Sequence, residues 1–288
     1  MDNKKTILIT GANGQLGQAF REIAEVNIKY SFIFTDKSAL DITNQNAVNN
    51  FFAANNIDVC INCAAYTAVD KAETENEIAI AVNTIAVGFL AKACKNTHTQ
   101  FIHISTDYVF DGTATQPYQP TNATNPINFY GLTKLNGELL AIKENTQTII
   151  IRTAWVYSQF GNNFVKTMLR LMAQKHSIDV VNDQYGAPTN AADLVEAIMC
   201  IINTNNFVAG IYHYTNIGNI TWFEFAKEIA NNLKTTCIVQ PIPSAQFKNA
   251  AARPTYSILN SSKIIEMYNV PMYNWQLSLQ KCINTILQ

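Results

Sequence analysis

The sequence has little charge and no excess of either sign. Its 288 residues include 20 Lys and Arg against 21 Asp and Glu, which gives a formal net charge of −1, and only 14% of the residues are charged. Proteins that bind a nucleic-acid backbone carry clustered basic residues, so no nucleic-acid partner is expected. The hydrophobic fraction of 48% is typical of a globular protein, which excludes a disordered or fibrous chain.

Long apolar runs are also missing. Asn, Thr, Lys or Asp interrupts every apolar run before the roughly 18 residues that a membrane span needs. The stretch from Met1 to Thr10 is too short for a secretory signal peptide. We therefore expect a cytoplasmic protein that does not interact with a membrane.

The six cysteines do not form the pattern of a disulfide framework in a chain of this length. Cys60 and Cys63 have the spacing of a redox pair, but an extended chain directs residues three apart to opposite faces. We expect buried free thiols. The four histidines, at positions 98, 103, 176 and 213, do not pair at ligand spacing, so no metal site is expected.

The first 158 residues alternate short β-branched runs with amphipathic stretches, which is the pattern of βαβ units and a parallel sheet. Strands are predicted at 6–10, 31–35, 58–63, 100–105 and 148–153. Helices are predicted at 15–26, 44–55, 73–96 and 129–144. The expected fold is α/β, with a Rossmann-like, doubly wound parallel sheet.

Beyond residue 158 the alternation of β-branched runs and amphipathic stretches is less regular, and four prolines interrupt the C-terminal part of the chain. Helices are predicted at 162–175, 191–203, 221–233 and 276–287, with a strand at 210–215. We expect 1–158 to form a dinucleotide-binding Rossmann domain, to which 191–217 returns. The ranges 159–190 and 218–288 are expected to form a smaller, partly interleaved C-terminal substrate lobe.

A glycine-rich turn, Gly11 to Gly17, joins the first predicted strand to the first helix. The N-terminus of that helix offers free N–H groups and the positive end of the helix dipole to a pyrophosphate. Asp36 ends the second predicted strand, where its carboxylate can accept hydrogen bonds from an adenosine ribose. Asp36 favours NADH, but the neighbouring Lys37 can neutralise the 2′-phosphate of NADPH, so both coenzymes stay open.

Tyr130 and Lys134 lie one turn apart at the start of the predicted helix 129–144. A phenol with a pKa of about 10 transfers protons poorly at neutral pH unless a nearby cation favours its ionised form, and Lys134 can supply that cation. Ser105 and Thr106 stand at the carboxyl end of the preceding strand, where ligands bind in open α/β sheets.

A nucleotide loop, a strand-end hydroxyl and a Tyr/Lys pair, in that order, resemble the extended short-chain dehydrogenase/reductase superfamily, and within it the sugar-nucleotide reductases. The resemblance covers nearly the whole chain. It rests on segments 11–17, 62–73, 105–110, 126–138, 152–157, 161–164, 182–189 and 253–254.

The resemblance implies an enzyme that uses NADH or NADPH to reduce the C4 ketone of dTDP-4-dehydro-L-rhamnose to dTDP-L-rhamnose, which supplies a cell-surface polysaccharide. Tyr130 would protonate the ketone oxygen, Thr106 would hydrogen-bond to it, and Lys134 would hold the nicotinamide ribose and tune Tyr130. The cofactor-binding residues that it implies are Gly11, Gly14, Gln15, Leu16, Gly17, Asp36, Asp41, Ile42, Ala65, Tyr66, Thr67, Tyr130 and Lys134.

The substrate contacts that the resemblance implies lie in both halves of the chain. They are Thr106, Asp107, Trp155, Asn163, Gln184 and Arg253. Arg253 is suited to pair with the diphosphate. Some family members are dimers bridged by Mg²⁺, but Gln18 to Phe20 replaces the acid expected after the glycine-rich turn. A homodimer therefore stays open, and a metal-linked one is not expected.

Other functions of the same fold stay as alternatives. Sugar-nucleotide dehydratases carry an acid directly after the Thr-Asp at the strand end, where this chain has Tyr108, so reduction is favoured over elimination. An epimerase, a reductase of a related dTDP-4-keto-6-deoxy sugar, and a non-catalytic nucleotide-binding regulatory subunit are the remaining alternatives. The complete set of Thr106, Tyr130 and Lys134 favours an enzyme.

Overall fold

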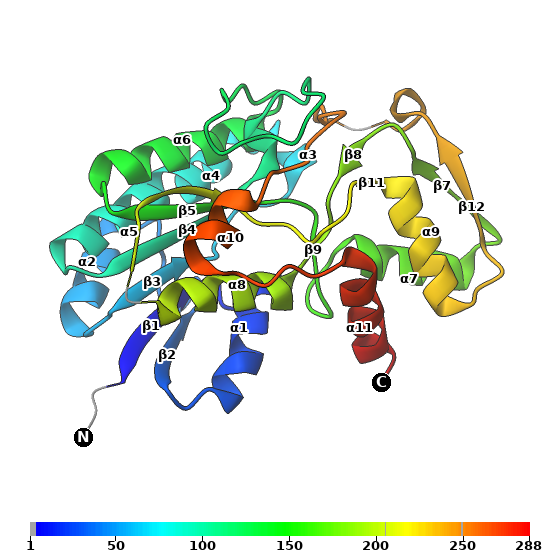
Figure 1. Ribbon diagram of the computed structural model, residues 1–288. Coiled ribbons are helices and arrows are strands. Elements are labelled where there is room, and N and C mark those ends of the chain that lie inside the picture. Colours follow the sequence, from blue (N-terminus) through cyan, green and yellow to red (C-terminus); the bar gives the residue numbers. More distant parts are fainter. Residues whose placement is uncertain (1–3, 205, 249) are drawn as a thin grey trace.

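A six-stranded, fully parallel sheet forms the centre of the larger part of the molecule (Figure 1). The computed structural model describes residues 4–204, 206–248 and 250–288. Residues 1–3, 205 and 249, which belong to the predicted domain ranges, lie outside the described residues. The strands are β1 (Lys5–Thr10), β2 (Tyr30–Thr35), β3 (Val59–Asn62), β4 (Gln100–Thr106), β5 (Thr148–Thr153) and β10 (Gly210–His213).

The strands lie in the order β10-β5-β4-β3-β1-β2. The direction of winding reverses between β1 and β3, because β2 follows β1 on one side and the later strands are added on the other. In open α/β sheets a ligand-binding crevice forms outside the carboxyl ends of the strands at such a reversal. The doubly wound α/β prediction is confirmed, and the sheet places its binding edge where the glycine-rich turn follows β1.

Helices cover both faces of the sheet (Figure 1). On one face lie α1 (Gln15–Val26) and α8 (Ala191–Asn203); on the other lie α2 (Gln45–Ala54), α5 (Ala86–Asn96) and α6 (Phe129–Glu144). Alternate residues of a strand face opposite sides, so Ile7 and Ile9 pack toward α1 and α8 while Leu8 packs toward α2 and α5. Cys60 and Cys63 pack in different clusters, and the described cysteines are free thiols, as expected.

The helix expected over 73–96 is present as one continuous helix over Asn76–Asn96, which consists of α4 (Asn76–Ile80), a π-helical turn (Ala81–Ile85) and α5. A separate short helix, α3 (Val69–Ala72), precedes it, and the π turn was not predicted. The π turn carries the fully buried Asn83, whose side chain bonds to both main-chain polar atoms of Tyr66 and to the Thr133 hydroxyl. These long-range hydrogen bonds offset the free-energy cost of the π-helical geometry. The hydrophobic periodicity of the sequence gives no indication of them.

The stretch Asn76–Asn96 is the one described helix long and apolar enough, by length and composition, to cross a membrane. Half of its most apolar window is buried inside the structure, and α5 packs against α6 and the sheet. It therefore occupies the place of a core helix.

A smaller part of the molecule lies beside the sheet, with its own apolar core (Figure 1). Its elements are β6 (Val156–Tyr157), α7 (Phe164–Gln174), β7 (Ser177–Val181), β8 (Tyr185–Gly186), β9 (Thr189–Asn190), β11 (Ile220–Thr221), α9 (Trp222–Leu233), β12 (Ile238–Ile242) and α11 (Trp275–Leu287). The prediction missed β7 and its parallel partner β12, because several of their side chains are exposed and β12 contains Pro241, a residue that is rare inside strands.

The chain passes between the two parts more than once. α8 packs on α1, and β10 pairs with β5. One further element, α10 (Ser262–Tyr268), was expected in the substrate lobe but lies on the large sheet: Ile264, Tyr268 and Val270 belong to the same apolar cluster as Ile7 and Ile9. The short 3₁₀ turns Asp107–Val109 and Ser244–Gln246 complete the elements. The division into two domains stays a prediction.

A buried ion pair joins α6 to β5. Arg152 Nη2 lies 2.7 Å from Glu138 Oε2, and Arg152 Nε lies 2.9 Å from Glu138 Oε1, with both side chains at most 2% exposed. The guanidinium carbon also lies 5.0 Å from the centre of the Phe110 ring. Paired charges with several hydrogen bonds offset their desolvation, whereas a single buried charge does not.

Glu138→Ala should therefore lower the free energy of unfolding by about 3–5 kcal/mol, because it leaves the Arg152 guanidinium buried without its partner. Urea denaturation of the two proteins measures the difference. Lys143→Gln, an exposed change on the same helix, is the control and should stay within about 0.5 kcal/mol. A loss below 1 kcal/mol for Glu138→Ala would show that the pair does not anchor α6.

Candidate active site

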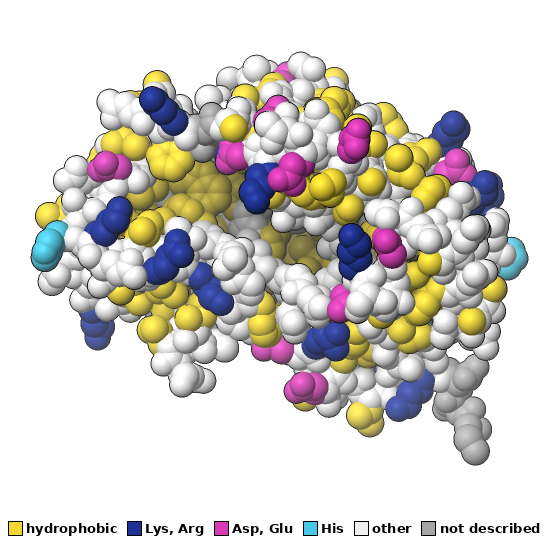
Figure 2. All heavy atoms as spheres, turned by 180° about the vertical axis from the view of Figure 1, so that it is seen from behind, with side chains coloured by type: hydrophobic (Ala, Val, Ile, Leu, Met, Phe, Trp, Pro, Cys, Tyr) yellow, Lys and Arg dark blue, Asp and Glu magenta, His cyan; other side chains and the backbone are white. Residues whose placement is uncertain are grey.

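Two adjoining cavities of about 590 Å³ each open at the carboxyl edge of the sheet. Gly14, Cys63 and Ala65 line both cavities, so together they form one continuous cleft. Figure 2 shows the surface hollowed between the two parts of the molecule, with apolar side chains inside the hollow. One end of the cleft reaches Asp36 after β2, and the other reaches Tyr130 on α6.

The glycine-rich turn forms the floor between the two ends. Gly11 has a φ of +66°, and a Cβ there would lie 2.6 Å from the Ala64 nitrogen, so only glycine fits. Gly14 caps α1 without any side-chain cap, which leaves the first N–H groups of that helix free for a ligand. Gln15 and Leu16 line the cleft, whereas Gly17 packs against the Ala12 backbone and does not.

The Asp36 end has an ionised carboxylate that the local turn holds in place. Asp36 Oδ1 accepts from the Ser38 hydroxyl at 2.6 Å and from the Ala39 nitrogen at 3.0 Å, and Oδ2 accepts from Asn13 Nδ2 at 2.9 Å. Hydrogen bonds, first of all that from Ser38, lower the pKa of Asp36 to about 2. Lys37, Asp41 and Ile42 line the same cavity.

At the other end, α6 presents Tyr130 and Lys134 in its first turns. Asn128 caps this helix by accepting from the Gly131 nitrogen at 2.8 Å, and its own amide donates to the Ala252 carbonyl at 2.8 Å. The Tyr130 ring meets Tyr108 edge-on, with 5.8 Å between ring centres. Burial raises the pKa of the Tyr130 phenol above its usual value, while the Thr106 side chain opposes the shift.

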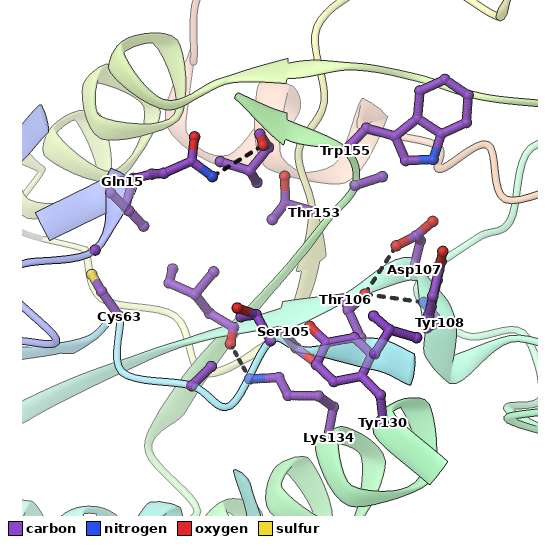
Figure 3. A pocket seen from close by; sticks show the side chains of 18 of the residues that line it. Gln15, Cys63, Ser105, Thr106, Asp107, Tyr108, Tyr130, Lys134, Thr153 and Trp155 are labelled. Carbon is purple, nitrogen blue, oxygen red and sulfur yellow. Dashed lines mark hydrogen bonds between the residues drawn. The ribbon is translucent and has the colours of Figure 1, made fainter. Parts of the chain in front are cut away.

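Lys134 points at the main chain of β4 (Figure 3). Its Nζ donates to the Ile104 carbonyl at 2.6 Å and lies 3.3 Å from Nε2 of the buried His103. Burial lowers the pKa of Lys134 to about 8. Lys134 is not among the groups that shift the pKa of Tyr130, so its expected effect on the phenol stays a prediction.

Thr106 ends β4 and Asp107 follows it, and both face the same end of the cleft (Figure 3). Thr106 Oγ1 donates to Asp107 Oδ1 at 2.9 Å. Asp107 is 2% exposed, and its Oδ2 has no hydrogen-bond partner among the described residues. Burial raises the pKa of Asp107 to about 6. A buried oxygen without a partner is costly, and such atoms are common where a ligand is bound.

Trp155 forms the opposite wall. Its backbone has a φ of +48°, which is unusual for a bulky residue and typical of binding sites. The indole stacks on Trp222, with ring centres 3.5 Å apart and an interplanar angle of 11°. Gly186 also packs closely against it, since a Cβ there would be 2.5 Å from the indole. The contacts with Trp222 and Gly186 therefore hold this wall in position.

Several predicted site residues do not line the cleft. They are Gly17, Tyr66, Asn163, Gln184 and Arg253. Tyr66 donates its hydroxyl to Glu75 at 2.7 Å. Asn163 caps α7 through the Lys166 nitrogen and donates to Gln15 Oε1 at 2.9 Å.

Arg253 is already paired. Its guanidinium binds both carboxylate oxygens of Asp70, at 2.9 and 2.7 Å. Asp70 therefore occupies the contacts that were expected for a diphosphate, and the role of Arg253 stays a prediction. Gln184 is buried, at 7% exposure.

Other lining residues were missed. Trp222 gave no signal in the sequence, because it lies far along the chain and reaches the site only through the stack with Trp155. Asn13 lies inside the glycine-rich turn, and its bond to Asp36 could have been anticipated from that position. Within residues 4–204, 206–248 and 250–288, no three His, Cys, Asp or Glu side chains gather as a metal site.

Comparisons with known proteins agree with this geometry. The family model of the RmlD substrate binding domain matches residues 5–288. The dTDP-4-dehydrorhamnose reductase of Aggregatibacter actinomycetemcomitans is 37% identical over 284 residues, which cover 95% of this chain and 97% of the relative.

Two solved structures cover 98% of this chain and 100% of their own, each with a TM-score of 0.94. One is a dTDP-4-dehydrorhamnose reductase from Clostridium acetobutylicum, at 39% identity. The other is that of Bacillus anthracis in complex with NADP, at 38% identity. This chain therefore belongs to the RmlD substrate-binding-domain family of dTDP-4-dehydrorhamnose reductases.

Proposed function

We propose that this chain reduces the C4 ketone of dTDP-4-dehydro-L-rhamnose to dTDP-L-rhamnose with NADPH or NADH, the last step in making this sugar donor for cell-surface polysaccharide. The observation that carries the proposal is the convergence of Thr106, Tyr130 and Lys134 on one end of a dinucleotide-sized cleft. The membership in a reductase family supports the same conclusion.

The residues present fit a nicotinamide dinucleotide. Gly11 lets the turn pack tightly against Ala64, and the free N–H groups at the start of α1 suit the charge of a pyrophosphate. The Asp36 carboxylate suits ribose hydroxyls, with Asp41 and Ile42 beside the adenine. Ala65 and Thr67 would flank the coenzyme, which supplies a hydride to the ketone carbon when it is bound.

Side chains of the protein would then stabilise and protonate the oxygen of the substrate ketone. Tyr130 would donate its proton to the ketone oxygen, and Thr106 would hydrogen-bond to that oxygen as negative charge develops on it. Lys134 would hold the nicotinamide ribose. Asp107 and Trp155 would contact the sugar, since Asp107 Oδ2 has no partner among the described residues and Trp155 forms the facing wall.

We also propose where the enzyme is located in the cell and that it forms a homodimer. We place the enzyme in the cytoplasm, because nucleotide sugars and reduced coenzymes are charged and do not cross a bilayer unaided. A homodimer fits the apolar side chains that α4, the π-helical turn and α6 expose. They are Ile78, Ile85, Leu132, Leu139 and Ile142.

The first test is the loss of reduced-nicotinamide absorbance when purified protein meets dTDP-4-dehydro-L-rhamnose, run separately with NADH and NADPH. Rapid oxidation is the expected result, and it ranks the coenzymes in the same experiment. Coenzyme binding without turnover would instead indicate a related dTDP-4-keto-6-deoxy sugar as substrate, or a regulatory subunit.

Tyr130→Phe should lower kcat by about 10²- to 10⁴-fold, the usual contribution of one positioned acid, with little change in coenzyme affinity. The matched control is Tyr212→Phe, which also removes a bonded tyrosine hydroxyl but lies outside the cleft. Steady-state kinetics and coenzyme fluorescence titration give the two quantities. Undiminished turnover in Tyr130→Phe would remove Tyr130 from its role as the acid.

Asp36→Asn should shift coenzyme preference toward NADPH by roughly tenfold, because it removes a carboxylate charge that repels a 2′-phosphate. The measurement is the ratio of the dissociation constants of NADH and NADPH. Asp41→Asn, in the same cavity, is the control and should change both constants alike. An unchanged ratio for Asp36→Asn would show that Asp36 does not face the 2′ position.

Asp107→Asn should stabilise the protein at pH 8 but not near pH 4. The folded-state pKa of Asp107, about 6, lies above its unfolded value of 3.8, so the native state loses stability as the pH rises through 6. Two pKa units correspond to about 3 kcal/mol. Urea denaturation at both pH values measures the effect.

Asp111→Asn serves as a control of opposite sign, because hydrogen bonds from Thr113 lower the pKa of Asp111. Its stabilising contribution is present above the unfolded pKa and is lost as the pH falls. If Asp107→Asn has the same effect at pH 4 and pH 8, the buried carboxyl does not titrate in this range.

A further inference from the structure

A line of buried polar side chains runs beneath the cleft from β1 to α6. Thr10, Asn62 and His103 lie directly opposite one another on the neighbouring strands β1, β3 and β4. Thr10 Oγ1 lies 2.6 Å from Asn62 Oδ1, Asn62 Nδ2 lies 3.1 Å from His103 Nδ1, and His103 Nε2 lies 3.3 Å from Lys134 Nζ. None of the four side chains is more than 1% exposed, and the proposed reaction assigns no role to Asn62 or His103.

The first link sets the orientation of the Asn62 amide. The main-chain N–H of Ala64 donates to Asn62 Oδ1 at 3.2 Å, and a main-chain N–H can only donate. The Thr10 hydroxyl approaches the same oxygen. The oxygen of Asn62 must therefore face Ala64 and Thr10, and its NH₂ group faces His103.

The second link sets the tautomer of His103. Because the Asn62 NH₂ group donates, His103 Nδ1 must accept and carries no proton. Burial, and then the neighbouring Lys134, hold the pKa of His103 well below its usual value, so the ring is neutral. A neutral imidazole without a proton on Nδ1 carries it on Nε2, and Nε2 is the atom that faces Lys134.

The third contact, between His103 and Lys134, bears on the protonation state of Lys134. An ammonium group offers only donors, whereas a neutral amine also has a lone pair that can accept. Lys134 Nζ already donates to the Ile104 carbonyl at 2.6 Å. A neutral amine satisfies both neighbours by donating to Ile104 and accepting from His103, whereas an ammonium would meet the Nε2–H of His103 donor to donor.

We propose that Asn62 and His103 form a tautomer lock, defined by these two residues, which favours the neutral amine of Lys134 while its Nζ rests against β4. His103 is thus a positioning residue for the proposed reduction, on which this inference rests. Lys134 becomes an ammonium near Tyr130 when its amine turns away from the Nε2–H of His103 and takes up a proton from water in the cleft that it lines. The lock therefore links the charge of Lys134 to its position.

The other groups around Lys134 also affect whether its side chain is charged or neutral. Glu138, one turn further along α6, favours the ammonium, but Arg152 pairs with that carboxylate. Cys63, which follows β3, also favours the ammonium weakly. Tyr130 lies one turn earlier on α6, and His103 faces the amine from β4. Burial outweighs the favourable charges, in agreement with the lowered pKa of Lys134.

The direct test is ¹⁵N NMR of histidine-labelled protein stripped of coenzyme. His103 should show a neutral ring with its proton on Nε2. His213 is an internal control, because its Nδ1 lies 3.0 Å from the Tyr118 carbonyl, which can only accept, so its proton should be on Nδ1. Single variants of the four histidines assign the signals.

Opposite tautomers at the two buried rings are the expected result. A proton on His103 Nδ1, or a charged ring at neutral pH, would overturn the proposal. The measurement uses neither coenzyme nor sugar, so its outcome is independent of whether the proposed reductase activity is found.

A variant tests the effect on Lys134. In Asn62→Asp the carboxylate can only accept, so the proton of His103 should move to Nδ1 and the Nε2 lone pair should face Lys134. The pKa of Lys134 should then rise by at least one unit, a tenfold change in its protonation constant. Carbon-13 NMR of the lysine Cε carbons against pH measures it, with Lys134→Met assigning the signal.

Asn145→Asp is the matched control. It makes the same change at a buried asparagine that caps the Gln147 nitrogen and has no bond to His103 or Lys134. The pKa of Lys134 should not change in this control. His103→Leu is a second test variant, because it removes the facing donor without adding a carboxylate charge and should also raise the pKa of Lys134. An unchanged pKa in the folded variant would refute the lock.

Discussion

The close seating of α6 on the sheet is the constraint on which the site depends. This helix carries Tyr130 and Lys134, and it approaches its neighbours so closely that a Cβ at Gly137 would lie 2.1 Å from the Asn83 carbonyl. The buried pair of Glu138 and Arg152 fixes the same helix to β5. A small shift of α6 would move both side chains away from the end of β4, where Thr106 stands. The stability of the core and the alignment of the site therefore rest on the same contacts.

The cleft contains buried polar atoms that have no hydrogen-bond partner within the described part of the chain, and it contains a residue with an unusual backbone conformation. Asp107 Oδ2 and the Ser105 hydroxyl have no partner among the described residues, and Trp155 holds a left-handed backbone conformation. Each of these features costs about 1–3 kcal/mol. The large parallel sheet and its two apolar faces can offset such costs, since much of the described chain packs in the two clusters around it. The apolar packing of the sheet thus makes it possible for the cleft to keep these strained and unsatisfied groups.

Much of the fold followed from local pattern. The alternation of β-branched runs and amphipathic stretches predicted the five leading strands and the helices α1, α2 and α6 within a few residues. The π turn before α5 escaped prediction because it carries Asn83, which bonds to Tyr66 and Thr133, 17 and 50 residues away. The strands β7 and β12 escaped because they pair with each other across 61 residues and expose several side chains, which weakens the apolar pattern.

The sequence by itself determined which chemical groups the protein carries and in what order they follow the strands. The glycine-rich turn, Asp36, Thr106, Tyr130 and Lys134 were predicted in this way, because parallel strands bring their carboxyl ends to one edge. Tertiary structure alone decided what each group meets there. It paired Arg253 with Asp70, 183 residues away, stacked Trp222 on Trp155, and set the Lys134 amine against His103. Partners and protonation depend on burial and on contacts between distant segments, and local sequence pattern contains neither.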